Sequence, residues 1–207
     1  FLIDIPQLGH MNRQIFVYFP TEYFLSDTRF PVIYVQSAQD LFVTSDSVNG
    51  NWVINQDLFN YYTNHLDREY IIVGIVSDPY LFWEEHSPWV NEHMYLWMDP
   101  YNANRSEGGR GDDYLDFIVH TLKPYIDANY RTLPSQETTA IAGHRTGGLF
   151  SIYAALKRPD IFSKAIALSP SVWFAEGGGS WLSNNHLINL IANVQISDNV
   201  SFIIDIA

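Results

Sequence analysis

The stretch Thr139-Ala-Ile-Ala-Gly-His-Arg-Thr-Gly-Gly-Leu149 decides the fold of this sequence. It opens with small and β-branched residues, which favour a buried strand. Gly143 and Gly147 then stand two residues either side of Arg145, where absent Cβ atoms allow the chain to turn tightly. A mostly apolar helix is predicted over residues 147–157, ended by basic residues and a proline. The stretch therefore predicts a strand that turns sharply into a helix.

This turn has the spacing of the G-x-S-x-G nucleophile elbow, the frame that presents a reactive serine above a sheet in acyl-transfer enzymes. Gly143, His144, Thr146 and Gly147 make up the frame, and Arg145 holds its central position. A guanidinium stays protonated and has no lone pair with which to attack a carbonyl. The frame of the site is therefore present, whereas its expected reactive oxygen is not.

Strand and helix patterns alternate along the rest of the chain. Helices are predicted at residues 51–66, 112–126, 147–157 and 180–192, and Pro124 is expected to kink or restart the second of them. Short apolar runs that predict strands lie at residues 14–19, 30–35, 70–76, 138–142, 165–168 and 200–206. The alternation predicts a single α/β domain over residues 1–207, with a mostly parallel central sheet flanked by helices.

One long stretch, residues 78–104, falls outside this alternation and is rich in aromatic rings. Loops of this length are often lids or binding loops, although the rings would equally serve to cover the edge of the sheet. Glu84-Glu85-His86 and Glu92-His93 within it match no compact metal-binding motif, so we expect no metal site and read them as surface residues.

Composition excludes several classes of function. The chain has 207 residues, 47% of them hydrophobic, which is enough to bury a real core. Its net charge of −12 argues against nucleic acid and anionic membrane surfaces as partners. The absence of cysteine excludes a thiolate nucleophile and leaves the redox compartment open. No apolar run approaches the length needed to cross a membrane, so a soluble protein is expected, either secreted or cytoplasmic. No pattern indicates a cofactor.

Taken together, these segments resemble the putative esterase family of α/β-hydrolases, which includes enterochelin, feruloyl and acetyl esterases, S-formylglutathione hydrolase and the antigen 85 mycolyltransferases. The resemblance covers nearly the whole chain and implies the α/β-hydrolase fold. It rests on Arg13-Gln-Ile-Phe-Val-Tyr-Phe-Pro20, Phe30-Pro-Val-Ile-Tyr-Val35, Asp112-Asp-Tyr-Leu-Asp-Phe117, Lys123-Pro-Tyr-Ile-Asp-Ala-Asn-Tyr-Arg-Thr132, Gly147-Gly-Leu-Phe-Ser-Ile-Tyr-Ala-Ala-Leu-Lys157, Pro159-Asp-Ile-Phe-Ser163 and Ala167-Leu-Ser-Pro-Ser171.

The chain departs from the family pattern at three places. Arg145 stands where the resemblance implies the nucleophilic serine. The loop Gln36-Ser-Ala-Gln-Asp40 differs from the family's usual Leu-Asp-Gly-Gln-Asn, although the resemblance still makes the backbone N–H groups of Gln39 and Thr146 the oxyanion-hole candidates. The family's acid and histidine would both lie beyond Ala207, so the domain is expected to be incomplete at its C-terminus and to lack the last strand and helix.

The positive charge of Arg145 is expected to need a negatively charged partner. The residue occupies a turn with strained backbone angles and a helix N-terminus, where a cation is disfavoured. We therefore expect Arg145 to pair with an acid above the turn, either Asp40, Glu84 or Glu85, or with a bound carboxylate or phosphate. The alternative is that its side chain extends into solvent while its stem covers apolar surface.

Two functions follow as hypotheses. The first is a catalytically inactive pseudo-esterase that binds a small aromatic or anionic molecule or acts as a structural protein, with pocket candidates Asp40, Trp83, Glu84, Trp89 and Trp173. The second is an active carboxylic ester hydrolase or acyltransferase whose sequence here is altered or truncated. The apolar run at residues 200–206 would be an uncovered edge, which suggests either a longer chain or a homo-oligomer formed through that strand.

Overall fold

The computed structural model describes residues 1–42, 68–91, 107–175, 186–194 and 199–205. The helix predicted at residues 51–66 lies outside these ranges, as does the second half of the aromatic stretch. Within the described ranges, every helix is too short or too polar to traverse a lipid bilayer.

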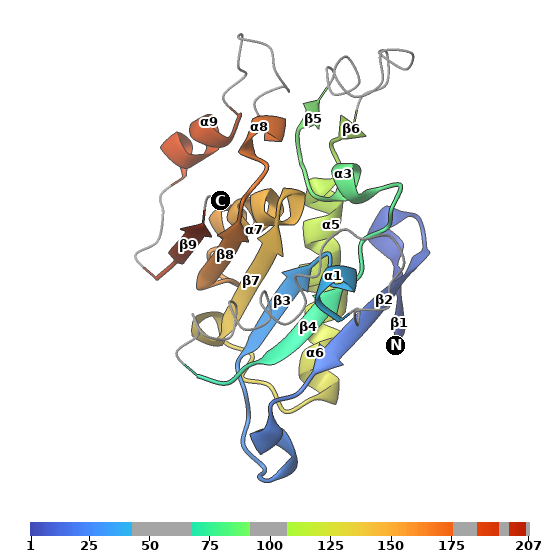
Figure 1. The fold of residues 1–207 in the computed structure, drawn as a ribbon, viewed down its shortest axis with the longest axis vertical. Coiled ribbons are helices and arrows are strands. Elements are labelled where there is room, and N and C mark those ends of the chain that lie inside the picture. Colours follow the sequence, from blue (N-terminus) through green and yellow to red (C-terminus); the bar gives the residue numbers. More distant parts are fainter. Residues whose placement is uncertain (43–67, 92–106, 176–185, 195–198, 206–207) are drawn as a thin grey trace.

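A seven-stranded sheet runs through the molecule (Figure 1). β2 is antiparallel to both of its neighbours, and every other pair of neighbouring strands is parallel. The predicted mostly parallel sheet is therefore confirmed. Across the sheet the strands are β1 (Leu2–Ile5), β2 (Met11–Tyr18), β4 (Ile71–Ile75), β3 (Val32–Gln36), β7 (Thr139–His144), β8 (Lys164–Leu168) and β9 (Ser201–Asp205).

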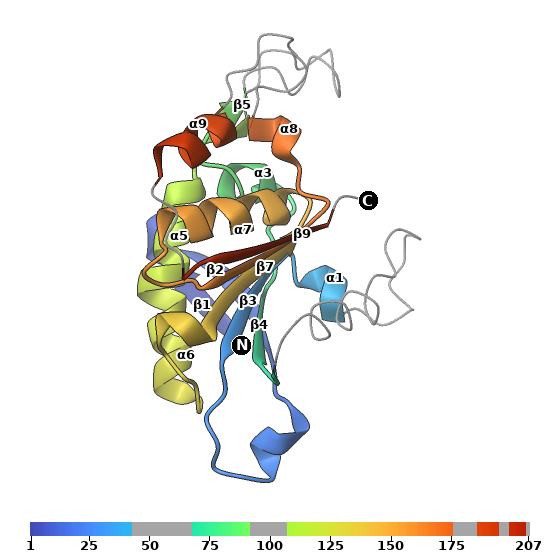
Figure 2. The same ribbon diagram turned by 90° about the vertical axis from the view of Figure 1, so that its left-hand side faces the viewer.

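Helices cover both faces of this sheet (Figure 2). One face carries α5 (Gly111–Phe117), the π-helical turn η4 (Ile118–Leu122), α6 (Lys123–Asn129) and α7 (Thr146–Lys157), whereas α1 (Gln39–Phe42) lies on the other. Above the carboxyl ends of the parallel strands lie α3 (Phe82–Glu85), α8 (Val172–Ala175), α9 (His186–Asn193) and the small sheet of β5 (Val90–Asn91) and β6 (Glu107–Gly108) (Figure 1). Three short 3₁₀ turns complete the described elements: η1 (Pro6–Leu8), η2 (Thr21–Phe24) and η5 (Gln136–Thr138).

The core is divided by the sheet into two apolar layers. Along β3, Val32 and Tyr34 belong to the layer beneath α5, α6 and α7, whereas Ile33 and Val35 belong to the opposite layer. Every residue of β3 and β4 is buried, which is the pattern of parallel strands that are covered on both faces. This rigid centre fixes where the carboxyl ends of the strands lie.

The restart expected at Pro124 is present. Proline lacks an N–H and its ring clashes with the carbonyl four residues earlier, so the regular hydrogen-bond ladder cannot pass through it. The chain accommodates this with the wider turn η4 immediately before α6, whose first turn contains Pro124.

Two further predictions are refined by the structure. The helix expected over residues 180–192 is described as α9 from His186, and the separate short helix α8 precedes it. The last apolar run forms β9, which pairs in parallel with β8 and is the outermost strand on that side of the described sheet.

Candidate functional site

The turn between β7 and α7 adopts the sharp geometry that its sequence predicts. Arg145 has φ 52° and ψ −118°, a left-handed conformation that costs a non-glycine residue about 1–3 kcal/mol. Main-chain hydrogen bonds hold it on both sides. The Arg145 N–H donates to the Leu168 carbonyl at 3.0 Å, and the Arg145 carbonyl accepts from the Ser171 N–H at 2.9 Å.

Glycines are required here because the backbone segments touch. A Cβ on Gly143 would lie 2.3 Å from the carbonyl carbon and oxygen of Gly147. A Cβ on Gly147 would lie 2.8 Å from Cβ of Gln36, the last residue of β3. The frame glycines therefore allow the strand, the helix and the neighbouring strand to pack against one another.

Strained backbone is concentrated at this end of the sheet. Ser37, Arg145 and Ser169 all have positive φ values, of 56°, 52° and 40°. They follow β3, β7 and β8, which are neighbours in the sheet. Residues held in such conformations cluster at ligand-binding and active sites. Ligands of open α/β sheets also bind beyond the carboxyl ends of the strands, so this edge is the candidate site.

The loop after β3 is fixed by side-chain contacts to the end of β4. Ser37 Oγ lies 2.9 Å from Ser77 Oγ, and Gln39 Oε1 accepts a hydrogen bond from the Ser77 N–H at 3.0 Å. Gln39 and Thr146 are the first residues of α1 and α7, which follow the adjacent strands β3 and β7. The sheet thus places the two oxyanion-hole candidates at the ends of neighbouring strands.

Beneath the turn lies a buried polar cluster made of Gln36, His86, Tyr114 and Thr146. His86 Nδ1 lies 3.1 Å from Thr146 Oγ1, and the Tyr114 hydroxyl donates to Gln36 Oε1 at 2.8 Å. Burial, with a smaller contribution from the charge of Arg13, lowers the pKa of His86 to about 3. Within the described residues, His86 Nε2 and Gln36 Nε2 are buried without a hydrogen-bond partner.

The contact between His86 and Thr146 has the separation of a base and a hydroxyl nucleophile. The lowered pKa makes this imidazole a weak base near neutral pH, however, and both side chains are almost completely buried. The cluster therefore supports the first turn of α7 and is a poor candidate for nucleophilic chemistry.

The expectation that Glu84-Glu85-His86 are surface residues is wrong for two of the three. Glu85 is 1% exposed and His86 is fully buried, at the end of α3. Arg13 of β2 donates two hydrogen bonds to the Glu85 carboxylate, at 2.8 and 2.5 Å, and a third to the Val76 carbonyl at 3.1 Å. Burial raises the pKa of Glu85, and the hydrogen bond from Arg13 opposes that effect. Glu85 is thus committed to Arg13 and is not a partner for Arg145.

The side chain of Arg145 is exposed at the carboxyl edge of the sheet. Of its other expected acidic partners, Glu84 is half-buried in α3, and the side chain of Asp40 lies outside the described part of the structure. The neighbouring His144 is half-buried, and burial together with the charge of Arg145 lowers its pKa. Pairing of Arg145 with an acid therefore stays a prediction.

The aromatic pocket candidates divide into two groups. Trp83 stacks on Phe174 with ring centroids 5.1 Å apart and meets Trp173 edge-on at 5.9 Å. Trp89 instead packs against Tyr153 of α7 and His186 of α9. Trp173 is 47% exposed, so the group formed by Trp83, Trp173 and Phe174 is the one that presents an aromatic surface.

The fold and this turn define an α/β-hydrolase of the esterase type, and the comparisons with known proteins give the family. Residues 8–207 match the family described as putative esterase, so the chain belongs to that family. Among curated proteins it is similar to the uncharacterized protein YbbA of Bacillus subtilis, with 27% identity over 163 residues. It is also similar to the siderophore enterobactin esterase of Emericella nidulans, with 35% identity over 66 residues.

Solved structures agree on the fold. An IroE-like serine hydrolase from Shewanella oneidensis matches 92% of this chain with a TM-score of 0.66 and 23% identity. The enterobactin esterase of Shigella flexneri matches 98% of it with a TM-score of 0.67 and 16% identity. The chain spans 58% of YbbA, 22% of the Emericella esterase, and 54% and 44% of these two structures.

Proposed function

We propose that this protein is a catalytically inactive esterase-like protein, a pseudo-esterase, that binds a small anionic aromatic molecule. The observation that carries the proposal is Arg145 at the strained central position of the turn, where the family resemblance implies a serine. An arginine side chain has no nucleophilic oxygen and no proton to lose at accessible pH. Ester hydrolysis through this position is therefore not expected.

The same residue gives the candidate site a preference for anions. α7 begins directly after Arg145, and the free N–H groups of a helix N-terminus attract negative charge. A cation there is disfavoured by about 0.3–1 kcal/mol, so a bound anion would remove a repulsion as well as form an ion pair. A carboxylate or phosphate is the group that suits both the guanidinium and the helix end.

The neighbouring aromatic group suggests what the rest of the ligand is. Trp83, Trp173 and Phe174 lie in α3 and α8, which cover the carboxyl edge of the sheet beside the turn. A ligand ring would stack on such a surface. The solved enterobactin esterase of Shigella flexneri was studied with 2,3-dihydroxy-N-benzoyl-serine, which carries both an aromatic ring and a carboxylate. We propose this compound as the first ligand to test.

Binding is tested by calorimetric titration of that compound into the protein and into Arg145→Ala. We expect saturable binding that weakens about tenfold in the variant, the effect of losing one charge-assisted hydrogen bond. Lys157→Ala, at the far end of the same helix, is the matched control and should bind as tightly as the unaltered protein. Equal affinities for the protein and Arg145→Ala would contradict the proposed site.

The alternative is an active carboxylic ester hydrolase or acyltransferase. It is favoured by the intact geometry of the turn, with its glycine contacts and its strained φ. Hydrolysis of p-nitrophenyl acetate by the unaltered protein above the uncatalysed rate would establish this alternative. Activity that appears only in Arg145→Ser would support the pseudo-esterase. Assembly of copies through β9 also stays a prediction, which light scattering over a concentration series can test.

A further inference from the structure

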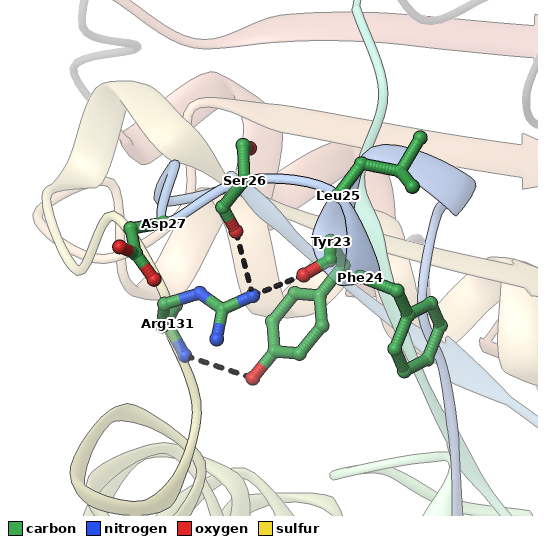
Figure 3. Close-up of a pocket in the computed structure, with 6 residues that line it drawn as sticks. All are labelled: Tyr23, Phe24, Leu25, Ser26, Asp27 and Arg131. Atoms are coloured by element: carbon green, nitrogen blue, oxygen red, sulfur yellow. Dashed lines mark hydrogen bonds between the residues drawn. The ribbon is translucent and has the colours of Figure 1, made fainter.

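A second candidate site lies at the other end of the strands, away from Arg145, where residues 19–31 connect β2 to β3 (Figure 1). A cavity of about 390 Å³ opens there, within the range of small-molecule sites. Figure 3 shows the side chains around it, which come from η2, from the residues that follow it and from the segment after α6. The lining residues are Tyr23, Phe24, Leu25, Ser26, Asp27 and Arg131.

The guanidinium of Arg131 is held in place at this cavity. Its Nη2 donates to the carbonyl oxygens of Tyr23 and Ser26, the second at 3.1 Å, and its Cζ lies 3.9 Å from the centroid of the Tyr23 ring (Figure 3). An arginine fixed in this way loses little conformational entropy when it binds a ligand. The cation is therefore preorganised by neutral groups.

Arg131 and Asp27 carry opposite charges on the walls of the same cavity, yet they form no ion pair within the described residues. Other arginines of the described ranges do pair with nearby acids: Arg13 with Glu85, Arg110 with Asp113, and Arg158 with Asp160. Arg131 and Asp27 thus line one cavity without forming an ion pair with each other. That arrangement suits a ligand with both an anionic and a cationic group.

The rim of the cavity is apolar. Phe24 and Leu25 are each 73% exposed, which is high for such large hydrophobic side chains. A ligand with an apolar substituent would cover part of them and gain the free energy of removing that surface from water. The rim thus adds a third requirement to the two charges.

We propose that this cavity binds a free α-amino acid with a large apolar side chain. The ligand carboxylate accepts hydrogen bonds from the Arg131 guanidinium, the ammonium group donates to the Asp27 carboxylate, and the side chain lies against Phe24 and Leu25. This site is separate from the one at Arg145 and depends on none of its residues.

The test is a calorimetric titration of the full chain with three related probes that all carry a phenyl ring. L-Phenylalanine carries both charges, 3-phenylpropionate lacks the ammonium group, and phenethylamine lacks the carboxylate. We expect L-phenylalanine to bind about tenfold more tightly than either analogue, because each analogue loses one charge-assisted contact. No saturable binding of L-phenylalanine up to about 10 mM, or equal binding of all three probes, would overturn the proposal.

Two variants assign the roles of the charged residues. Asp27→Asn should abolish the preference for L-phenylalanine over 3-phenylpropionate, whereas Asp116→Asn on the exposed side of α5 should keep it. Arg131→Lys should weaken L-phenylalanine binding, and Arg29→Lys, which alters a neighbouring arginine outside the cavity, should not. Asp27 is exposed and makes no hydrogen bond within the described residues, so we expect Asp27→Asn to fold. This variant therefore tests the proposal even if Arg131→Lys is unstable. If Asp27→Asn keeps the preference for L-phenylalanine over 3-phenylpropionate, Asp27 does not bind the ammonium group and the proposal is wrong.

Discussion

The imidazole of His86 lies 3.1 Å from the hydroxyl of Thr146, although 60 residues separate them in the chain. The contact joins the end of α3 to the start of α7, and it is completely buried. Burial favours the neutral form of His86. Protonation of this imidazole would therefore destabilise the packing that supports the turn at Arg145.

Stability should therefore fall in acid because of His86. The pKa of His86 is about 3 in the folded protein and near 6.5 when unfolded, so the unfolded state binds more protons between these values. Stability is fully retained above pH 6.5 and decreases toward pH 3, by at most about 1.4 kcal/mol per pH unit from this residue. Urea unfolding at pH 7, 5 and 4 measures the slope. His86→Gln should show a shallower slope than the unaltered protein.

Removing the charge of one partner in the Arg13–Glu85 ion pair should strongly destabilise the folded protein. Glu85→Gln leaves a buried guanidinium without its counter-charge, and we expect a loss of about 3–5 kcal/mol in the free energy of unfolding. Asp160→Asn, which breaks the exposed pair with Arg158, should cost less than about 1 kcal/mol. The double variant Arg13→Met with Glu85→Leu should recover part of the loss. A small effect of Glu85→Gln in chemical denaturation would show that the pair is not buried.

Gly143→Ala should destabilise the protein more than its small volume suggests. The added methyl group would lie 2.3 Å from main-chain atoms of Gly147, which cannot rotate away as a side chain does. We expect a loss of about 3 kcal/mol or more. Gly9→Ala is the comparison, since its methyl group would meet open space and only its positive φ is penalised. Similar midpoints for the two variants in thermal unfolding would contradict the close contact.

Arg145→Gly should stabilise the fold while weakening ligand binding under the proposed function. Relief of the positive φ favours the variant by about 1–3 kcal/mol, and the greater freedom of glycine in the unfolded chain opposes it by about 0.5–1 kcal/mol. The net expectation is a gain of about 1 kcal/mol in denaturant unfolding. Lys157→Gly, at the last residue of α7, should bring no such gain and should lose at most about 1 kcal/mol. A loss of stability in Arg145→Gly would mean that the turn is not strained.

The central strands and the turn were predictable because their signals are local. β-branched runs marked β3 and β4, and two glycines at fixed spacing marked the turn at Arg145. The change in helical geometry before Pro124 was predictable for the same reason, since one residue dictates it.

The polar support of the site could not be read from the sequence. Arg13 and Glu85 are 72 residues apart and meet only because β2 lies beside β4 in the sheet. Glu85 and His86 sit in a short helix with no apolar periodicity, so nothing local indicated that they are buried. The charged cavity at Arg131 was missed likewise, because its two walls come from segments more than 100 residues apart.

The main-chain hydrogen bonds that join residue 145 to Leu168 and Ser171 affect which substitutions evolution can make at this position. They hold the turn through main-chain atoms that every amino acid except proline possesses, so the side chain there can be exchanged without rebuilding its surroundings. Some arginine codons, such as AGA and AGG, differ from a serine codon by one nucleotide. From such a codon, a single point mutation would convert a cationic site into one that bears a hydroxyl, on an unaltered scaffold.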